Sequence, residues 1–237
     1  MMVSVEAEGG IIADCLGPAP HRLPQVGSTM RGTINNIPVV YSISGLGKTN
    51  AAHCLTSLIL RYSPSAVILF GVGGAYPGTG LGVGDVAVAT KEVYADEGVL
   101  LEDGPHSLEL IGIPLLKAGR RKYFNEFPLD ALLSKRMLRA ARSAGRRAEA
   151  GVFTTVSACT GTTRRAKELS SRFGAICENM EGAAAVHVCR LYGIPIVEVR
   201  GISNIVEARD ISKWDIAKAS ESCQRTVIEF LKGLGSR

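Results

Sequence analysis

Long hydrophobic runs are missing from this chain of 237 residues, although 46% of its residues are hydrophobic. No stretch approaches the roughly eighteen consecutive apolar residues of a membrane-spanning helix, so the sequence predicts no such helix. The first residues lack both a charged segment and a long apolar stretch, which argues against a secretory signal. A chain of this length suits one large domain over residues 1–237 and can bury a substantial core.

Paired cysteines are also missing. The six cysteines are spread along the chain: Cys15, Cys54, Cys159, Cys177, Cys189 and Cys223. They form no Cys-x-x-Cys pair, and no two of them have the spacing of metal ligands. We therefore expect free thiols in a reducing cytoplasm, and no metal or cofactor.

Two nucleotide-binding motifs are incomplete. The segment Gly45–Thr49 resembles the end of a phosphate-binding P-loop, but Ser42 stands where that motif requires a glycine. The glycine-rich segment 71–84 contains no Gly-x-Gly-x-x-Gly, since the sixth position counted from Gly71 is Tyr76. These departures weigh against a P-loop enzyme and a dinucleotide-binding fold.

The net charge of +5 is partly concentrated in one segment, Lys135–Arg147. The same region carries an apolar stripe at helical spacing: Leu132, Leu133, Met137, Leu138 and Ala141. This pattern predicts a packed helix with a solvated basic face, and no nucleic-acid partner.

Strand and helix patterns alternate through most of the chain, which predicts a wound α/β sheet. Apolar strands are expected at 39–43, 66–72, 85–90, 151–156, 175–177 and 195–202. Helices are expected at 49–62, 129–144, 163–172, 181–192 and 213–234. A hairpin turning at Asn35-Asn36 precedes them, a glycine loop fills 71–84, and an irregular excursion spans 98–128. Ligands gather at the carboxyl ends of strands in such sheets, here after residues 43, 72, 156, 177 and 202.

Four of these loops carry a recognisable set of segments: Ser44–Lys48, Phe70–Ala75, Glu178–Ala185 and Arg200–Asn204. In this order and spacing they resemble the nucleoside phosphorylase/nucleosidase superfamily. The resemblance implies a single α/β domain with a twisted mixed β-sheet flanked by helices, and a homo-oligomer, a dimer or larger. The segments 73–78, 94–96, 201–204 and 209–210 are most similar to the futalosine hydrolases. That similarity implies hydrolysis of futalosine to hypoxanthine and dehypoxanthine futalosine in menaquinone biosynthesis.

A ribose site is expected around Glu181. Cleavage of an N-glycosidic bond passes through an oxocarbenium-like sugar, and a carboxylate both holds two ribose hydroxyls and stabilises the developing cation. The resemblance gives this role to Glu181, with Met180 packing on the sugar and Arg200 steadying the carboxylate. Further binding residues are expected in the same segments: Gly73 and Gly74, whose backbone can approach a ligand closely, and Asn179 and Ser203.

The leaving purine is expected to meet Asn204. Adenine-specific relatives in this superfamily carry an aspartate after the serine of this loop. An ionised carboxylate would repel the O6 of a 6-oxopurine, whereas an amide can donate a hydrogen bond to it. Asn204 therefore favours hypoxanthine over adenine. Asp210 is expected either to donate a proton to the base or to cap the helix that follows it.

Water needs a general base, and the resemblance places a glutamate just after the first strand. Glu8 aligns best with that place, and Glu6 is the alternative. Phosphorolysis is the rival reaction, but Leu69 stands where hexameric phosphorylases carry a phosphate-binding arginine. Water is therefore the expected acceptor.

Other functions stay open at this point. An adenine nucleosidase of the methylthioadenosine/S-adenosylhomocysteine type would use the same ribose site. A nucleoside-binding protein without turnover would need no general base.

Overall fold

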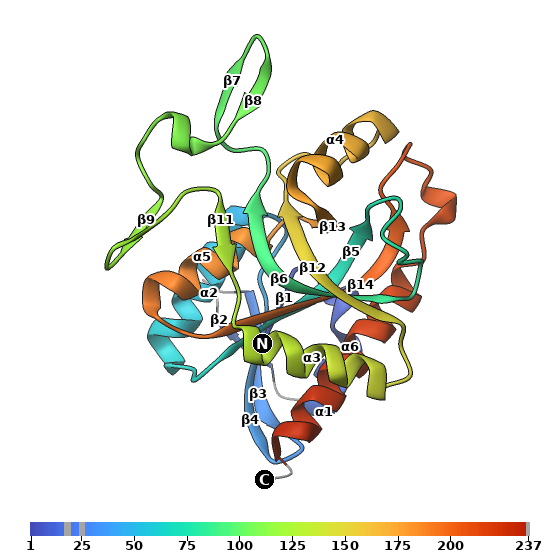
Figure 1. The fold of residues 1–237 in the computed structure, drawn as a ribbon. Coiled ribbons are helices and arrows are strands. Elements are labelled where there is room, and N and C mark those ends of the chain that lie inside the picture. Colours follow the sequence, from blue (N-terminus) through green and yellow to red (C-terminus); the bar gives the residue numbers. More distant parts are fainter. Residues whose placement is uncertain (17–19, 24–26, 236–237) are drawn as a thin grey trace.

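A computed structural model describes residues 1–16, 20–23 and 27–235, and among these ten strands form one mixed sheet (Figure 1). Its strands are β1 (Met2–Val3), β2 (Pro20–Leu23), β3 (Gly27–Ile34), β4 (Ile37–Ile43), β5 (Val67–Ala75), β6 (Val86–Tyr94), β11 (Glu126–Pro128), β12 (Ala148–Thr155), β13 (Ala175–Asn179) and β14 (Ile196–Ile205). The order is β11-β6-β12-β13-β5-β1-β4-β3-β2, and β14 pairs with both β5 and β6. The predicted α/β class with a mixed sheet is confirmed.

The strand β14 closes part of this sheet into a ring. It runs parallel to β5 and antiparallel to β6, while β6, β12, β13 and β5 pair in sequence. Strands β1 and β4 run parallel to β5 as well. The carboxyl ends of β1, β4, β5 and β14 therefore lie at one edge of the sheet, where ligands are expected.

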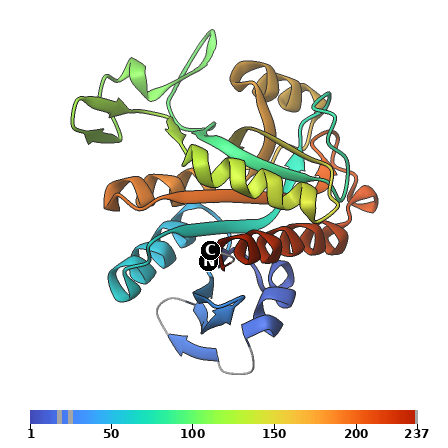
Figure 2. The ribbon, with the colours of Figure 1, turned by 60° about the horizontal axis from the view of Figure 1, so that its bottom comes forward.

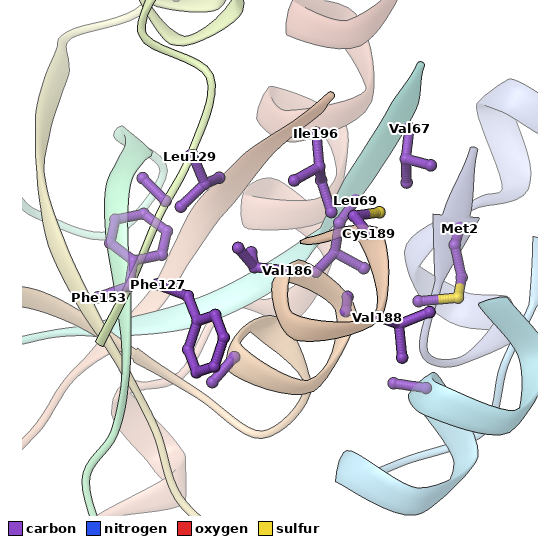
Figure 3. Close-up of a cluster of buried hydrophobic side chains, with 14 of the residues drawn as sticks. Met2, Val67, Leu69, Phe127, Leu129, Phe153, Val186, Val188, Cys189 and Ile196 are labelled. Atoms are coloured by element: carbon purple, nitrogen blue, oxygen red, sulfur yellow. The ribbon is translucent and has the colours of Figure 1, made fainter. Parts of the chain in front are cut away.

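Helices cover both faces of the sheet (Figure 2). They are α1 (Gly10–Leu16), α2 (Lys48–Tyr62), α3 (Ala131–Ser143), α4 (Thr163–Phe173), α5 (Gly182–Tyr192) and α6 (Ile216–Gly235). Side chains of β5 alternate between two cores, as the period of a strand requires. Val67 and Leu69 join the cluster with α2 and α5 that Figure 3 shows, whereas Ile68 and Phe70 join the cluster with α3 and α6.

Several local expectations are confirmed and two need correction. Asn35 and Asn36 have φ of 49° and 64°, the left-handed pair of a two-residue hairpin turn between β3 and β4. The glycine loop expected from Gly71 begins later, because β5 continues to Ala75 between β13 and β14. The excursion is not wholly irregular, since it holds β7 (Val99–Leu101), β8 (Gly104–His106), β9 (Leu116–Ala118) and β10 (Arg121–Tyr123).

The basic helix α3 packs against α6 and the sheet, as its apolar stripe predicted. Met137, Ala140 and Ala141 are buried, but Leu132 is 60% exposed because it lies off the buried face. Within the described part of the chain, no helix is both long and apolar enough to cross a membrane.

Candidate active site

The turn between β13 and α5 aims the Glu181 carboxylate away from its own helix. Asn179 caps the helix instead, since its Oδ1 accepts from the backbone N–H of Glu181 at 2.9 Å and of Gly182 at 2.6 Å. Its Nδ2 donates to Glu92 Oε1 at 2.6 Å. The Asn179 side chain thus lies beneath the turn and caps α5, while its contact with substrate stays a prediction. It positions Glu181, whose side chain makes no capping bond.

Glu181 joins loops that are far apart in the sequence. Its Oε1 accepts from the backbone N–H of Gly47 at 2.9 Å, and its Oε2 accepts from Arg200 Nη1 at 3.4 Å. Gly47 has a φ of +91°, a conformation that favours glycine. The loops after β4 and β13 and the strand β14 therefore meet at one carboxylate that is only 2% exposed.

Arg200 is the buried cation of this cluster. Its Nε donates to Glu198 Oε1 at 2.9 Å, and its Nη1 also donates to Val72 O at 3.3 Å. Burial by itself would lower the pKa of Arg200, but Glu198, Glu181 and Glu8 together raise it. The expected pairing of Arg200 with Glu181 is present, within a larger ion cluster.

Glu8 reaches the same cluster from the short 3₁₀ helix η1 (Glu6–Glu8) that follows β1. It is 7% exposed, whereas Glu6 is exposed. Burial raises the pKa of Glu8 to about 7, Arg200 opposes that rise, and Glu181 adds to it. A carboxyl group with such a pKa can accept a proton near neutral pH. The structure thus separates Glu8 from its alternative, Glu6.

Gly71 is the glycine that the Glu8 position requires. A Cβ built there would lie 2.5 Å from Glu8 Oε2 and 3.1 Å from Arg200 Nη1. Any side chain at residue 71 would therefore displace the two charged groups. The sequence pattern points instead to two other glycines of this segment, Gly73 and Gly74.

Gly73 and Gly74 are needed for packing within the protein. A Cβ at Gly73 would lie 2.7 Å from Cys177 Sγ, and one at Gly74 would lie 2.6 Å from Val206 Cγ2. Both contacts come from the neighbours of β5 in the sheet. The close approach of this backbone to a ligand stays a prediction.

A pair of buried carboxyl groups lies behind Arg200. Glu92 and Glu198 are both fully buried, and a Cβ at Gly182 would lie within about 2.5 Å of an oxygen of Glu198. Burial, followed by the charge of Glu198, raises the pKa of Glu92 well above its usual value of 4.5. Burial also raises the pKa of Glu198, although Arg200 opposes that rise. This pair was missed by the sequence analysis.

The charges around Arg200 disfavour a phosphate ion. One guanidinium faces the carboxyl groups of Glu8, Glu181 and Glu198, so its positive charge is already compensated. Leu69, the residue in the place of the phosphorylase arginine, is fully buried in the core beside α2 and α5. A phosphate bound here would lie beside carboxylates, and the described neighbours of Arg200 include no free cation to pair with it. Burying an unpaired anion costs free energy.

The carboxyl end of β14 presents an amide, because the strand continues to Ile205 and the loop expected after residue 202 begins later. Ser203 Oγ donates to Asn204 Oδ1 at 2.8 Å, which orients the amide and leaves that oxygen a second acceptor site. Nδ2 donates one hydrogen to Ile205 O at 3.2 Å, which leaves the second hydrogen for another acceptor. A Cβ at Gly74 would lie 3.2 Å from this nitrogen, so Asn204 Nδ2 stands over the bare backbone of Gly74.

Glu178 is a further buried carboxyl group, at 7% exposure, and lies across β5 from the end of β14. Thr160 donates to it twice, from the backbone N–H to Oε1 at 2.8 Å and from Oγ1 to Oε2 at 2.5 Å, and Tyr76 OH donates to Oε2 at 2.9 Å. The same segment brings Cys159 Sγ within 3.2 Å of Met180 Sδ, the residue expected to pack on the sugar. The sequence pattern assigns Glu178 no role of its own.

Asp210 is a cap rather than a buried acid. Its Oδ1 accepts from the Ser212 backbone N–H at 3.1 Å and from Ser212 Oγ at 2.6 Å, at the start of the 3₁₀ helix η3 (Ile211–Lys213). These bonds lower the pKa of Asp210, which favours the ionised form over a proton donor. Of the two expected roles, the geometry supports capping, of η3 rather than of α6.

The pKa of Glu8 predicts a pH-dependent cost to stability. Because the folded chain binds this proton more tightly than the unfolded chain, Glu8 stabilises the fold less as pH rises from about 4.5 to about 7. We therefore expect the free energy of unfolding of Glu8→Gln, relative to that of the wild type, to increase by about 2–3 kcal/mol as the pH rises from 5 to 8. Urea unfolding of both proteins at several pH values measures this difference. A difference that does not vary with pH would contradict the raised pKa.

Comparison with known proteins agrees with this geometry. The family model described as the phosphorylase superfamily matches residues 4–232. A futalosine hydrolase of Thermus thermophilus is 38% identical over 192 residues, which cover 81% of this chain and 80% of that protein. A 5'-methylthioadenosine/S-adenosylhomocysteine nucleosidase of Halalkalibacterium halodurans is 28% identical, over 86% of this chain and 84% of the relative.

A solved structure gives the same fold. It is the 5'-methylthioadenosine/S-adenosylhomocysteine nucleosidase of Neisseria meningitidis in complex with methylthio-immucillin-A, with a TM-score of 0.84 and 23% identity, covering 98% of this chain and 97% of that one. The fold, the buried carboxylate cluster and the curated relatives define an N-glycosidase of the hydrolase type. The chain belongs to the phosphorylase superfamily.

Proposed function

We propose that this chain hydrolyses the N-glycosidic bond of futalosine and releases hypoxanthine and dehypoxanthine futalosine, a step of menaquinone biosynthesis. The observation that carries the choice of base is Asn204, whose oxygen is held by Ser203 so that its NH₂ group is offered to the ligand. The hydrogen of this group that is not bonded to Ile205 suits O6 of a 6-oxopurine, an acceptor that adenine lacks. The similarity to the futalosine hydrolase of Thermus thermophilus supports the same substrate.

In this proposal Glu181 binds the two ribose hydroxyls and stabilises the cation that develops on the sugar. Met180 packs on the sugar, while Arg200 and Asn179 hold Glu181 in place. Glu8 takes a proton from the attacking water, since its pKa of about 7 suits that task.

On the side of the base, Asn204 hydrogen-bonds the leaving purine, and Ser203 fixes the Asn204 amide. Gly73 and Gly74, which carry no side chain, let the ligand approach the backbone of β5 closely. Asp210 holds the loop through its cap on η3 rather than by donating a proton.

The second candidate is an adenine nucleosidase that acts on methylthioadenosine, favoured by the similarity of the fold to the Neisseria meningitidis enzyme. One experiment separates the two. The protein is incubated with futalosine, aminodeoxyfutalosine or methylthioadenosine, each with and without phosphate, and the free base is measured. We expect hypoxanthine from futalosine at a rate independent of phosphate. Release of adenine alone would support the second candidate, and a requirement for phosphate would contradict hydrolysis.

Asn204→Asp is expected to move the preference toward adenine. An aspartate carboxylate would repel O6 of hypoxanthine and accept from the 6-amino group of adenine, which shifts selectivity by about 10–100-fold. The ratio of kcat/KM for futalosine and aminodeoxyfutalosine measures this change. Asp210→Asn is the matched control, because it makes the reverse exchange six residues away and should leave the ratio within a few-fold. An unchanged ratio in Asn204→Asp would remove Asn204 from base recognition.

We also propose that the chain forms a homo-oligomer. The excursion carries apolar side chains that this chain alone leaves uncovered: Leu100 (79% exposed), Leu110 (56%), Ile111 (50%) and Ile113 (70%). Exposed apolar groups gathered on one excursion are typical of association surfaces. Sedimentation velocity tests this, and a monomer at micromolar concentration would contradict it.

A further inference from the structure

Two supports hold Glu181 in place, and each of them ends at a buried carboxyl group. The first support acts on the backbone: Asn179 Oδ1 accepts from the Glu181 N–H, and Asn179 Nδ2 donates to Glu92 Oε1 at 2.6 Å. The second acts on the side chain: Arg200 donates to Glu181 through Nη1 and to Glu198 through Nε. Glu92 and Glu198 therefore lie at the far ends of the two supports.

The carboxyl groups of Glu92 and Glu198 meet beneath the start of α5. A Cβ built at Gly182 would clash with Glu92 Oε1 and lie 2.5 Å from Glu198 Oε2, so both oxygens border the same glycine. The two side chains hydrogen-bond to each other. Ionised carboxylates have only acceptor oxygens, so a hydrogen bond between two carboxyl groups requires a proton on one of them.

The contacts of the two groups indicate which one carries the proton. Glu198 Oε1 accepts from Arg200 Nε at 2.9 Å, but Oε2 is buried, and no N–H or hydroxyl of the described residues donates to it. Both oxygens of Glu92 have donors, from Asn179 Nδ2 and Thr155 Oγ1. The guanidinium favours an ionised Glu198, whereas the ion pairs of the described residues give Glu92 no cation. A buried charge without a cation is costly, which favours the proton on Glu92.

We propose that Glu92 is a positioning residue that stays a neutral acid and donates its proton to Glu198 Oε2. This hydrogen bond joins the two supports of Glu181 into one network and leaves Glu198 as the ionised partner of Arg200. Burial raises the pKa of both carboxyl groups, as a bound proton requires. The ionisable groups that face the pair are themselves buried: Arg200, Glu181, Tyr94 and Cys177. The positioning role rests on the proposed function, whereas the place of the proton does not.

Infrared spectra test the place of the proton without any substrate. A protonated carboxyl group has a C=O stretch that an ionised carboxylate lacks. At about pH 8, above the pKa of about 7 of Glu8, we expect this band in the wild type and in Glu8→Gln, and its loss in Glu92→Gln. Glu149→Gln, an exposed residue of β12, is the control and should keep the band. A wild type without the band, or an unchanged band in Glu92→Gln, overturns the inference.

The difference between the two carboxyl groups tests the positioning role. Glutamine is neutral, as the Glu92 acid is, and can still donate to Glu198, so Glu92→Gln should lower kcat/KM for futalosine by only a few-fold. Glu198→Gln removes the charge that holds Arg200 and should lower kcat/KM about 10–100-fold. Glu92→Leu, which also removes the hydrogen bond from Asn179, should lose as much activity as Glu198→Gln.

The outcomes separate this inference from the proposed function. If the wild type does not cleave futalosine, the proposed function fails, and the infrared band alone decides the place of the proton. If it does, a loss in Glu92→Gln as large as that in Glu198→Gln, with normal thermal unfolding of both, overturns the positioning role. Should either variant fail to fold, the spectra of the wild type and Glu8→Gln decide: the band in both supports the inference, and its absence overturns it.

Discussion

Glutamine in place of Glu8 is expected to lower kcat by about 10²–10⁴-fold, the usual contribution of a positioned general base. Glutamine keeps the size of the side chain but cannot take a proton from water. Burial holds the pKa of Glu8 at about 7, so the wild-type enzyme should lose kcat/KM about tenfold per pH unit below that value. Initial rates of hypoxanthine release from pH 5 to pH 9 measure both effects.

Glu6→Gln is the matched control for this experiment. Glu6 lies two residues away in the same short helix but is exposed, so its loss should change neither kcat nor the pH profile. The activity loss of Glu8→Gln should also come without unfolding, because removal of a buried carboxyl group relieves its desolvation. Full activity of Glu8→Gln together with a loss in Glu6→Gln would transfer the role to Glu6.

The sequence predicts the scaffold well where a pattern is local. The apolar runs at 66–72 and 195–202 correspond to β5 and β14, and the Asn35-Asn36 turn is the turn of a hairpin. The prediction fails at the end of β5, where glycines indicate a loop. Gly71–Ala75 stays a strand because β13 and β14 pair with it from both sides, and this long-range pairing outweighs the low strand propensity of glycine.

The site shows a similar division. Glu181, Arg200 and Asn204 follow from the resemblance, and the structure places Glu181 and Arg200 in contact. Asn179 is also predicted as a substrate contact, because a block of matching residues does not reveal which side chain turns inward. Only the bonds from Asn179 to the helix start show its role as a cap.

Glu92 and Glu198 carried a signal that the sequence analysis did not use. Each is a charged residue at a buried position of a strand, β6 or β14, where a charge needs a specific partner. The partners themselves lie far along the chain, since Glu92 bonds Asn179 and Thr155. A single sequence shows that such a partner must exist but does not identify it.

The cluster therefore acts as one electrostatic unit. Arg200 connects Glu8, Glu181 and Glu198, and the raised pKa of Glu92 favours its neutral form, which limits the negative charge behind Arg200. Burial would strengthen the attraction between the Glu181 carboxylate and a cation forming on the sugar. The same burial raises the pKa of Glu8, so that this group can accept a proton near neutral pH. In the proposed mechanism, one desolvated environment thus serves both the sugar and the water.

Glu181→Gln is expected to lower kcat by about 10²–10³-fold, because the neutral amide cannot stabilise the developing cation and binds the two ribose hydroxyls less well. Hypoxanthine release from futalosine at saturating substrate measures the loss. The Gly47 N–H and Arg200 bonds to this side chain offer only donors, so an amide NH₂ would also meet a donor at one of its two contacts. We therefore expect a modest loss of stability, which thermal unfolding can separate from the loss of activity.

A substrate without a 2'-hydroxyl distinguishes a ribose contact from a general disturbance of the site. If Glu181 binds that hydroxyl, the wild type should cleave 2'-deoxyfutalosine more slowly than futalosine, and Glu181→Gln should discriminate much less between the two. The non-additivity of the two changes measures the contact directly. Equal discrimination by both proteins would place the ribose elsewhere and leave Glu181 as a structural partner of Arg200 and Gly47.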